Sequence, residues 1–419
     1  MLSLQFIREH PDDVRDGARR KGEPAPVDEI LRLDTQARTL RAAVEEARFE
    51  QKQASKEIRG APSDEQRVGL EALKRRIQEG EGELAELDAR IAALLLEVPN
   101  PPHESVPEGR DASDNVVLRT WGEPPRFDFE PQPHYELGDR LGMFDFERAA
   151  KLSGSRFAVL RGDGARLQRA LTSFMIDIAT TEHGYAEVAP PYLVRREVMV
   201  GTAQLPKFED QAYHVEGDMF LIPTAEVPMT FLYSSEILDG TALPLSHVGL
   251  TPCWRQEAGA AGKDTRGYIR LHQFEKVEMV RFCAPERSLD ELELLTNHAE
   301  TVLQRLGIHH RVVLMCTGDL GFAQWKKYDI EAWAPGLQRW LEVSSCSVFA
   351  DFQARRANIR FRPGANERPQ FVHTLNGSGL GVPRTFDALI ETYQDADAAV
   401  RIPEPLRAYM HGRDRLTPS

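Results

Sequence analysis

The chain has 419 residues, of which 41% are hydrophobic and 28% are charged, and its formal net charge is −13 at pH 7. This length predicts two or three folding units, and the negative charge argues against a protein that coats polyanions with its whole surface. Arg8 and Glu9 stand where a signal peptide needs an apolar segment, and no apolar run approaches the roughly 20 residues of a membrane helix. Four cysteines without a CxxC pair favour reduced thiols. We expect a cytoplasmic protein that does not enter membranes and that binds any nucleic acid through a local basic surface.

Residues 27–98 carry the clearest periodic pattern of the chain. Positions that are apolar except for Gln51 recur in alternating steps of three and four, first at Ile30, Leu33, Ala37, Leu40, Val44, Ala47, Gln51, Ala54 and Ile58. After the turn-forming segment 60–64 the pattern resumes, with one step missing near Gly80, at Leu70, Leu73, Ile77, Leu84, Leu87, Ile91 and Leu94. Two long heptad segments joined by a short turn predict an antiparallel coiled-coil hairpin. The prolines of segment 98–107 end it, so we place an N-terminal domain at 1–108 and a second domain at 109–419.

Basic side chains gather near the expected turn of this hairpin. Residues 48–76 contain eight Lys or Arg against five Asp or Glu, whereas residues 77–98 contain one Arg against six acids. Steps of four, four and three predict one helix face for Arg48, Lys52, Lys56 and Arg59. A solvated coiled-coil surface and a contact with phosphate groups both explain this face, and the two interpretations stay open at this point.

Four segments of the second domain concentrate polar and charged side chains: 222–228, 253–280, 342–347 and 371–385. In extended backbone alternate side chains share a face. The first three segments therefore predict shared faces for Thr224 with Glu226, Arg255 with Glu257, and Glu342 with Ser344, with Ser345 opposite. His272, Phe274, Lys276 and Glu278 are expected to share a face in the same way. In the fourth segment, small residues predict a turn before a helix at 386–393.

A strand face with cations, carboxylates and an aromatic ring is unsuited to a core and well suited to a nucleotide. Arginines bind phosphates, carboxylates bind an amine or a metal ion, and an aromatic ring stacks on a base. Each segment alone is typical of ordinary structure. Together they predict an active site.

The segments TAE, WRQE followed by RLHQFEKVE, EVSSCS and NGSGLGVPRT resemble, in this order, the motifs of class II aminoacyl-tRNA synthetases. With the helical hairpin, nearly the whole chain resembles the bacterial seryl-tRNA synthetase family. The resemblance implies an α+β fold, in which helices flank an antiparallel catalytic sheet and an antiparallel helical hairpin precedes it. It implies a homodimer that uses ATP and Mg²⁺ to convert L-serine to seryl-adenylate and transfers the seryl group to tRNA(Ser), and to tRNA(Sec) where present. The hairpin, with the four basic residues near its turn, is then implied to bind the long variable arm of tRNA(Ser).

The resemblance also implies a role for individual residues. Arg255 would bind the α-phosphate, Arg384 the γ-phosphate and Glu278 the ammonium group of serine, and these three form the catalytic set. The pocket around serine would consist of Thr224, Ala225, Glu226, Glu278 and Ser378. Phe274 would stack on adenine, and Glu342 and Ser345 would be ligands of Mg²⁺. The full ATP site would be Arg255, Gln256, Glu257, Phe274, Glu342, Val343, Ser344, Ser345 and Arg384.

The implied chemistry requires these residue types. A carboxylate that attacks a phosphate needs fixed cations to neutralise the charge and align the groups, and it needs no protein nucleophile. Two alternatives remain: a ligase of the same fold that charges a carrier protein, which would lack the hairpin, and an inactive tRNA-binding paralogue, which would have degraded motifs. Ala203 stands where the family usually has glycine, and loop 258–268 is expected to order when ATP or the tRNA acceptor end binds.

Overall fold

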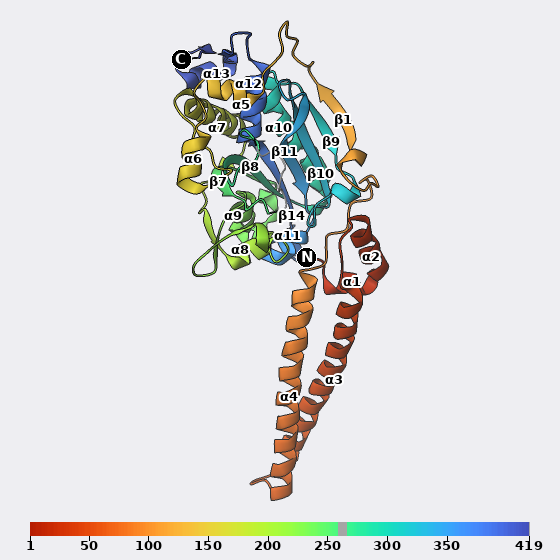
Figure 1. Ribbon diagram of the computed structural model, residues 1–419. Helices are drawn as coiled ribbons and strands as arrows, with labels where there is room; N and C mark the ends of the chain where they lie inside the picture. The colour runs from red at the N-terminus through yellow and green to blue at the C-terminus, as the bar shows by residue number, and fades with distance from the viewer. Residues whose placement is uncertain (259–265, 419) are drawn as a thin grey trace. The chain divides into compact units, whose positions relative to one another are not determined.

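The computed structural model describes residues 1–258 and 266–418, so most of the loop expected at 258–268 lies outside the described residues (Figure 1). The chain divides into two compact units, Met1–Pro101 and Pro102–Ser419. The division falls inside the proline-rich segment 98–107. Among the described helices, none is long and apolar enough to cross a membrane.

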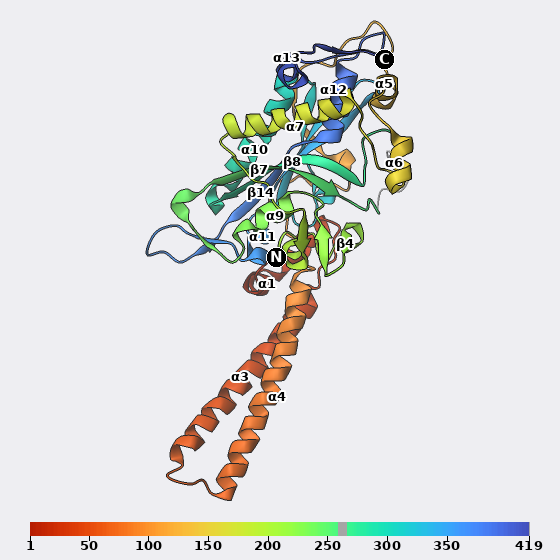
Figure 2. The ribbon, with the colours of Figure 1, turned by 90° about the vertical axis from the view of Figure 1, so that its left-hand side faces the viewer.

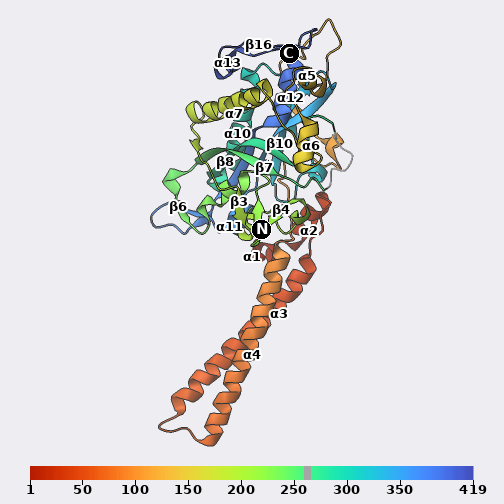
Figure 3. The same ribbon diagram turned by 60° about the vertical axis from the view of Figure 1, so that its left-hand side comes forward.

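The first unit is helical. It consists of α1 (Leu4–Glu9), α2 (Pro11–Arg20), α3 (Val27–Glu57) and α4 (Asp64–Leu95). Helices α3 and α4 form the predicted antiparallel hairpin, which is confirmed (Figure 3). Helix α4 begins with a capping box, in which Ser63 Oγ accepts from the Gln66 amide at 3.2 Å and Gln66 Oε1 accepts from the Ser63 amide at 2.9 Å. These bonds satisfy amides that a helix start would otherwise leave unpaired.

The missing heptad step near Gly80 has a physical cause. Gly80 is buried, and a Cβ atom at this position would lie 2.5 Å from Cγ2 of Val44 on the opposite helix. Such a distance is too short for two carbon atoms, so the two helices can approach each other here only because residue 80 has no side chain. The interruption in the apolar pattern thus marks a close packing point of the hairpin.

The four basic residues near the turn are not all on one helix face. Arg48, Lys52 and Lys56 belong to α3, which ends at Glu57, whereas Arg59 lies beyond its C-cap residue. The prediction that Arg59 shares the helix face is therefore wrong. The chain leaves the helix because Gly60 adopts a φ of +99° and Pro62 favours extended backbone before it.

The second unit is built on an eight-stranded sheet with the order β1-β9-β10-β11-β14-β8-β7-β2, antiparallel except for the pair β2 and β7 (Figure 1). Its strands are β1 (Val116–Trp121), β2 (Ala186–Glu187), β7 (Leu245–Trp254), β8 (Gln273–Cys283), β9 (His310–Leu314), β10 (Lys326–Ala334), β11 (Arg339–Val348) and β14 (His373–Gly381). Smaller sheets consist of β3 (Leu193–Arg195), β4 (Tyr213–Val215) and β5 (Met219–Leu221); of β6 (Ile237–Asp239), β12 (Arg360–Arg362) and β13 (Gln370–Phe371); and of β15 (Val400–Arg401) and β16 (Arg415–Leu416).

Helices pack on both faces of the large sheet. One face is covered by α7 (Asp163–Thr181), α10 (Ser288–Arg305) and α12 (Val382–Thr392), and the other carries α9 (Glu226–Thr230) and α11 (Phe352–Ala357) (Figure 2). The remaining helices are α5 (His134–Arg140), α6 (Phe146–Ser153), α8 (Arg196–Gly201) and α13 (Glu404–Arg407). The predicted fold class, an antiparallel sheet flanked by helices, is confirmed.

Strand β8 shows how the sequence specifies the two faces of the sheet. Val277 and Met279 pack into the main core under α7, α10 and α12, while Val280 and Phe282 pack on the opposite face with α9 and α11. Phe274, Lys276 and Glu278 continue this second face toward the start of the strand, because alternate residues share a face. The expected shared face is confirmed for these three residues, whereas His272, expected on the same face, lies before the strand begins. This face of β8 becomes polar beyond the part that is packed against α9 and α11.

Candidate active site

The polar face of β8 forms the floor of a cavity of about 440 Å³. Most of the predicted site residues line its wall, namely Thr224, Glu226, Arg255, Glu257, Phe274, Glu342, Val343, Ser344, Ser345, Ser378 and Arg384. Glu278 lies beneath the wall with 0% exposure. Ala225 packs into the core under α9, and Gln256 is exposed and outside the wall. Most residues predicted from the sequence therefore meet at one cavity. Ala225 and Gln256 do not line it, because the local backbone directs them elsewhere.

The segment around Thr224 and Glu226 is not a strand, so their predicted shared strand face is wrong. Thr224 Oγ1 accepts a hydrogen bond from the Glu226 amide at 3.2 Å, and Glu226 is the first residue of helix α9. A threonine hydroxyl that bonds to the amide two residues ahead favours a turn over a strand. Both side chains are nevertheless buried at the cavity, with 4% and 7% exposure.

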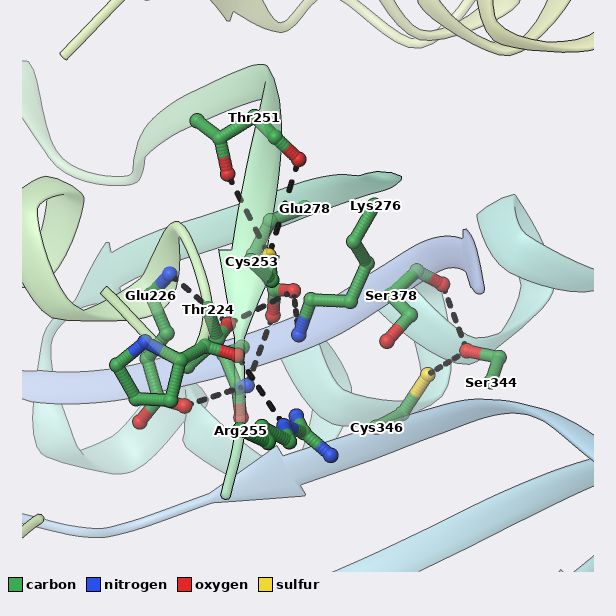
Figure 4. A network of polar contacts seen from close by, with 12 residues as sticks. Thr224, Glu226, Thr251, Cys253, Arg255, Lys276, Glu278, Ser344, Cys346 and Ser378 are labelled. Carbon is green, nitrogen blue, oxygen red and sulfur yellow. Dashed lines mark hydrogen bonds and ion pairs between the residues drawn. The ribbon is translucent and has the colours of Figure 1, made fainter. Parts of the chain in front are cut away.

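Two buried carboxylates are joined by one amide (Figure 4). Asn376 Nδ2, from strand β14, donates to Glu278 Oε1 at 2.9 Å and to Glu226 Oε2 at 3.0 Å. Thr224 Oγ1 donates to Glu278 Oε2 at 3.3 Å, and the Lys276 ammonium group forms an ion pair with Glu278. Gln353 Nε2 donates to Glu226 Oε1 at 2.7 Å.

The two carboxylates differ in the charge of their partners. Glu278 has a cation beside it, whereas Glu226 is held by the neutral amides of Asn376 and Gln353. Burial raises the pKa of Glu226 to about 7, and the nearby charge of Glu278 adds to this effect. Glu226 therefore changes charge close to neutral pH, as buried carboxyl groups without a cationic partner do.

Two arginines also line the cavity. Arg255 lies just beyond β7, where its Nε donates to the Pro223 carbonyl at 3.2 Å and its guanidinium group lies 5.2 Å from the centre of the Phe274 ring. Arg384 stands in the first turn of α12 and donates through Nη1 to the Glu342 carbonyl at 2.8 Å. Burial would raise the pKa of Glu342, but the positive charges of Arg384 and Lys327 outweigh it and hold this pKa below its ordinary value.

Arg255 and Glu257 do not share a strand face, because β7 ends at Trp254 and Glu257 adopts a φ of +51°. The Glu257 carboxylate instead accepts from Arg270 Nη1 at 3.2 Å. Ala203, which lines the same cavity, also has a left-handed φ of +66°. This conformation favours glycine, which explains physically why the family usually has glycine at this position.

A bulge in β11 reverses the predicted faces of its polar residues. Ser344 pairs with Ile330 and Glu342 pairs with Glu331, so Val343 has no partner on β10. The extra residue shifts the alternation. Val343 packs in the core, and Ser344 Oγ donates to the Ser378 carbonyl at 2.6 Å. The expectation that Glu342 shares a face with Ser344 is therefore wrong: the shift puts Glu342 and Ser345 on one side of the strand, while all four residues from 342 to 345 contribute to the cavity wall.

Most of the small-residue segment 371–385 is strand β14, and not the predicted turn. Strand β14 lies between β11 and β8 and places Ser378 directly opposite Glu278. A Cβ atom on Gly377 would lie 3.0 Å from Cys346 Sγ, so small residues serve close packing within the sheet. Helix α12 accordingly begins at Val382, four residues earlier than predicted, with Pro383 in its first turn.

Asn376 and Lys276 are site residues for which sequence reasoning assigned no role. Lys276 shares the face of Phe274 and Glu278, so its alternation could have identified it. Asn376 could not be found in this way, because it reaches both carboxylates only through the pairing of β14 with β8.

Comparisons with known proteins identify the family of the chain. The family model of the seryl-tRNA synthetase N-terminal domain matches residues 1–102, and that of the tRNA synthetase class II core domain (G, H, P, S and T) matches residues 207–393. A serine–tRNA ligase from Thermomicrobium roseum is 56% identical over 421 residues, which cover 99% of this chain and 95% of that protein. The chain belongs to the serine–tRNA ligase family.

Further members of the family are similar over their full length. A serine–tRNA ligase from Pelotomaculum thermopropionicum is 52% identical and covers 99% of this chain and 100% of its own. The crystal structure of seryl-tRNA synthetase from Pyrococcus horikoshii complexed with ATP superimposes with a TM-score of 0.95 at 42% identity, with 100% of both chains covered. The serine–tRNA ligase assignment implied by the motifs is confirmed, and neither the carrier-protein ligase nor the inactive paralogue is favoured.

Proposed function

We propose that this serine–tRNA ligase activates L-serine in the 440 Å³ cavity, with the amino acid at Glu278 and ATP at Arg255 and Arg384. The observation that carries the proposal is that this one cavity combines two arginines in its wall, Arg255 and Arg384, with the buried carboxylates of Glu226 and Glu278. A zwitterionic amino acid and a polyphosphate need these two environments side by side. The seryl group is then transferred to tRNA(Ser), and to tRNA(Sec) where that tRNA is present.

At the serine end, Glu278 binds the substrate ammonium group and Glu226, with Asn376 and Thr224, bonds to the side-chain hydroxyl. Ser378, opposite Glu278, completes the pocket. A site that hydrogen-bonds a hydroxyl discriminates strongly against an analogue without one, because the buried partners are then left unpaired. This accounts for serine being preferred to alanine.

At the ATP end, Phe274 stacks on adenine and Arg255 binds the α-phosphate, with Glu257 near the adenosine and Arg384 on the γ-phosphate. A carboxylate oxygen of serine attacks the α-phosphorus. The bond from that phosphorus to the bridging oxygen breaks, and pyrophosphate leaves. The two fixed guanidinium groups offset the repulsion between the serine carboxylate and the phosphates. Such electrostatic stabilisation supplies most of the rate enhancement in sites of this kind.

Glu342 and Ser345 are the proposed Mg²⁺ ligands. The bulge at Val343 brings this carboxylate and this hydroxyl to one side of β11, in the wall of the cavity, and both are the hard oxygen donors that Mg²⁺ prefers. Few protein ligands are typical of Mg²⁺ that is bound together with phosphates. The ion supplies charge neutralisation to the phosphates when bound, while Arg384 holds Glu342 in place through the 2.8 Å bond to its carbonyl.

For the tRNA, we propose that the hairpin binds the long variable arm through Lys52, Lys56 and Arg59, with Arg48 in a supporting role. Arg48 is more constrained, because it forms an ion pair with Glu81 of α4. A homodimer and a cytoplasmic location complete the proposal and rest on family membership. The exposed side chains of Lys52 and Lys56 suit a phosphate backbone, whose binding depends on charge more than on shape.

Serine-dependent exchange of pyrophosphate into ATP, measured across the twenty amino acids, tests the proposal. We expect exchange with serine, and Glu278→Gln should lower kcat/KM at least about a hundredfold, because it leaves the buried Lys276 without its partner and removes the ammonium ligand. Glu275→Gln is the matched control, since the neighbouring side chain bonds instead to Gln168, on helix α7, at 2.8 Å. Equal exchange by both variants would contradict the assignment of Glu278.

A further inference from the structure

A row of buried polar side chains follows one face of strand β14. Thr374, Asn376 and Ser378 alternate along the strand and therefore share this face. Thr374 lies opposite Phe282 of the paired strand β8, which packs in the apolar cluster with α9 and α11. Unlike Asn376 and Ser378, Thr374 does not line the cavity, and it is 0% exposed. A hydroxyl group in these surroundings costs free energy unless it is hydrogen-bonded, so its partner is informative.

The partner of Thr374 is a second buried polar residue that lies outside the cavity wall. Gln353, on helix α11, is 0% exposed, and its Oε1 accepts a hydrogen bond from Thr374 Oγ1 at 2.7 Å. Its Nε2 donates to Glu226 Oε1 at 2.7 Å and to the Thr202 carbonyl at 3.3 Å. Glu226 and Thr202 both line the cavity, so Gln353 connects two parts of the wall from behind.

The orientation of the Gln353 amide follows from these partners. A carbonyl oxygen can only accept a hydrogen bond, so the amide nitrogen must face the Thr202 carbonyl and the amide oxygen must face the Thr374 hydroxyl. The Glu226 carboxyl group thus receives one donor on each oxygen, from Gln353 on Oε1 and from Asn376 on Oε2. Two donors from different elements, helix α11 and strand β14, fix the plane of this carboxyl group.

We propose that Gln353 is a positioning residue for substrate specificity, which directs the Glu226 carboxyl group toward the serine hydroxyl, and that Thr374 holds Gln353 in the required orientation. A hydrogen bond weakens steeply when its angle departs from linearity, so a carboxyl group that rotates loses its bond to the hydroxyl. The inference rests on the proposed function, because it assumes that Glu226 bonds to this hydroxyl.

A specificity role differs from a purely structural one in what it affects. The ammonium group and the phosphates of the substrates are assigned to Glu278, Arg255 and Arg384, and none of these three side chains bonds to Gln353 in the part of the chain that the structure describes. Loss of Gln353 should therefore weaken the binding of a ligand with the serine hydroxyl. It should leave the binding of the same ligand without this hydroxyl nearly unchanged.

Two stable analogues of the aminoacyl-adenylate test this difference. Seryl and alanyl sulfamoyl-adenosine differ only in the side-chain hydroxyl, and calorimetry measures the dissociation constant of each. Gln353→Met retains the length of the side chain and removes the amide. We expect it to weaken binding of the seryl analogue about 10- to 100-fold, the range for a buried group that loses its partner, and binding of the alanyl analogue less than about threefold.

Substitutions of Thr374 decide the question if Gln353→Met fails to fold. Thr374→Val has nearly the same shape and removes only the hydroxyl, so it should weaken binding of the seryl analogue alone, about three- to tenfold. Thr374→Ser retains the hydroxyl and should bind within about twofold of the unmodified protein. Thr296→Val is the matched control, because Thr296 is also 0% exposed but bonds to the Leu292 carbonyl at 2.7 Å within helix α10. It should bind both analogues as the unmodified protein does.

The proposal is overturned if Gln353→Met, or Thr374→Val in its place, weakens both analogues equally or weakens neither. It is also overturned if Thr374→Ser binds the seryl analogue no better than Thr374→Val. An unmodified protein that binds the two analogues equally tightly would give a different result, because the proposed recognition of the serine hydroxyl would then itself be wrong.

Discussion

The raised pKa of Glu226 predicts a pH-dependent stability that a single substitution removes. Because the folded-state pKa, about 7, exceeds the ordinary value of 4.5, the folded state binds more protons than the unfolded state between these values. Stability contributed by the neutral carboxyl group is therefore lost as pH rises through this range. Glu226→Gln carries no charge and should not show the loss.

The expected magnitude follows from the two pKa values. Between pH 5.5 and pH 8 the ionisation of Glu226 should reduce the free energy of unfolding by about 2 kcal/mol, because a one-proton difference between the two states changes it by about 1.4 kcal/mol for each pH unit below the folded-state pKa. Glutamine disturbs the bonds to Gln353 and Asn376, but this cost is the same at both pH values. The free energy of unfolding of the variant, minus that of the unmodified protein, should therefore rise by about 2 kcal/mol from pH 5.5 to pH 8.

Urea unfolding followed by tryptophan fluorescence measures this difference. All five tryptophans, at 121, 254, 325, 333 and 340, lie in the second unit, so the signal reports the unit that contains Glu226. Glu216→Gln, a substitution of an exposed carboxylate between β4 and β5, is the control. Its difference from the unmodified protein in the free energy of unfolding should not change with pH. The reasoning is refuted if the difference in the free energy of unfolding between Glu226→Gln and the unmodified protein stays constant from pH 5.5 to pH 8.

Two further predictions concern the hairpin. Gly80→Ala should destabilise it by about 1–3 kcal/mol in thermal unfolding followed by circular dichroism, because the new Cβ would lie 2.5 Å from Val44 Cγ2. Gly82→Ala, whose Cβ would meet nothing within 4 Å, should instead stabilise the helix by about 1 kcal/mol, and equal effects of the two would contradict the packing argument. Removal of residues 27–98 should retain serine-dependent pyrophosphate exchange and abolish aminoacylation of tRNA(Ser), and normal aminoacylation would show that the hairpin does not bind the tRNA.

The features that the sequence predicted correctly are local ones. The heptad pattern of α3 and α4 and the alternation of Phe274, Lys276 and Glu278 each follow from the periodicity of a single element. The end of α3 before Arg59 was missed, although Gly60 and Pro62 are local signals of it.

The features that were missed depend on pairing between strands. The bulge at Val343 arises from the register of β11 against β10, and it alone puts Glu342 and Ser345 on the same side. Likewise, small residues in β14 have the composition of a turn, but they are needed because this strand packs closely between β11 and β8. The residues of one chain segment contain no information about such a register.

The two buried carboxylates differ in their partners, which suits the different roles proposed for them. Glu278 has Lys276 beside it, and Thr224 and Asn376 each donate a hydrogen bond to one of its carboxylate oxygens, which fixes its geometry. Glu226 has neutral partners and a pKa of about 7, so it can accept or donate a hydrogen bond to a hydroxyl according to its protonation state. Asn376 links the two and keeps its Oδ1 buried without a hydrogen-bond partner among the described residues. A substrate donor that bonds to this oxygen would remove the cost of leaving it unpaired, and a substrate without such a donor would not.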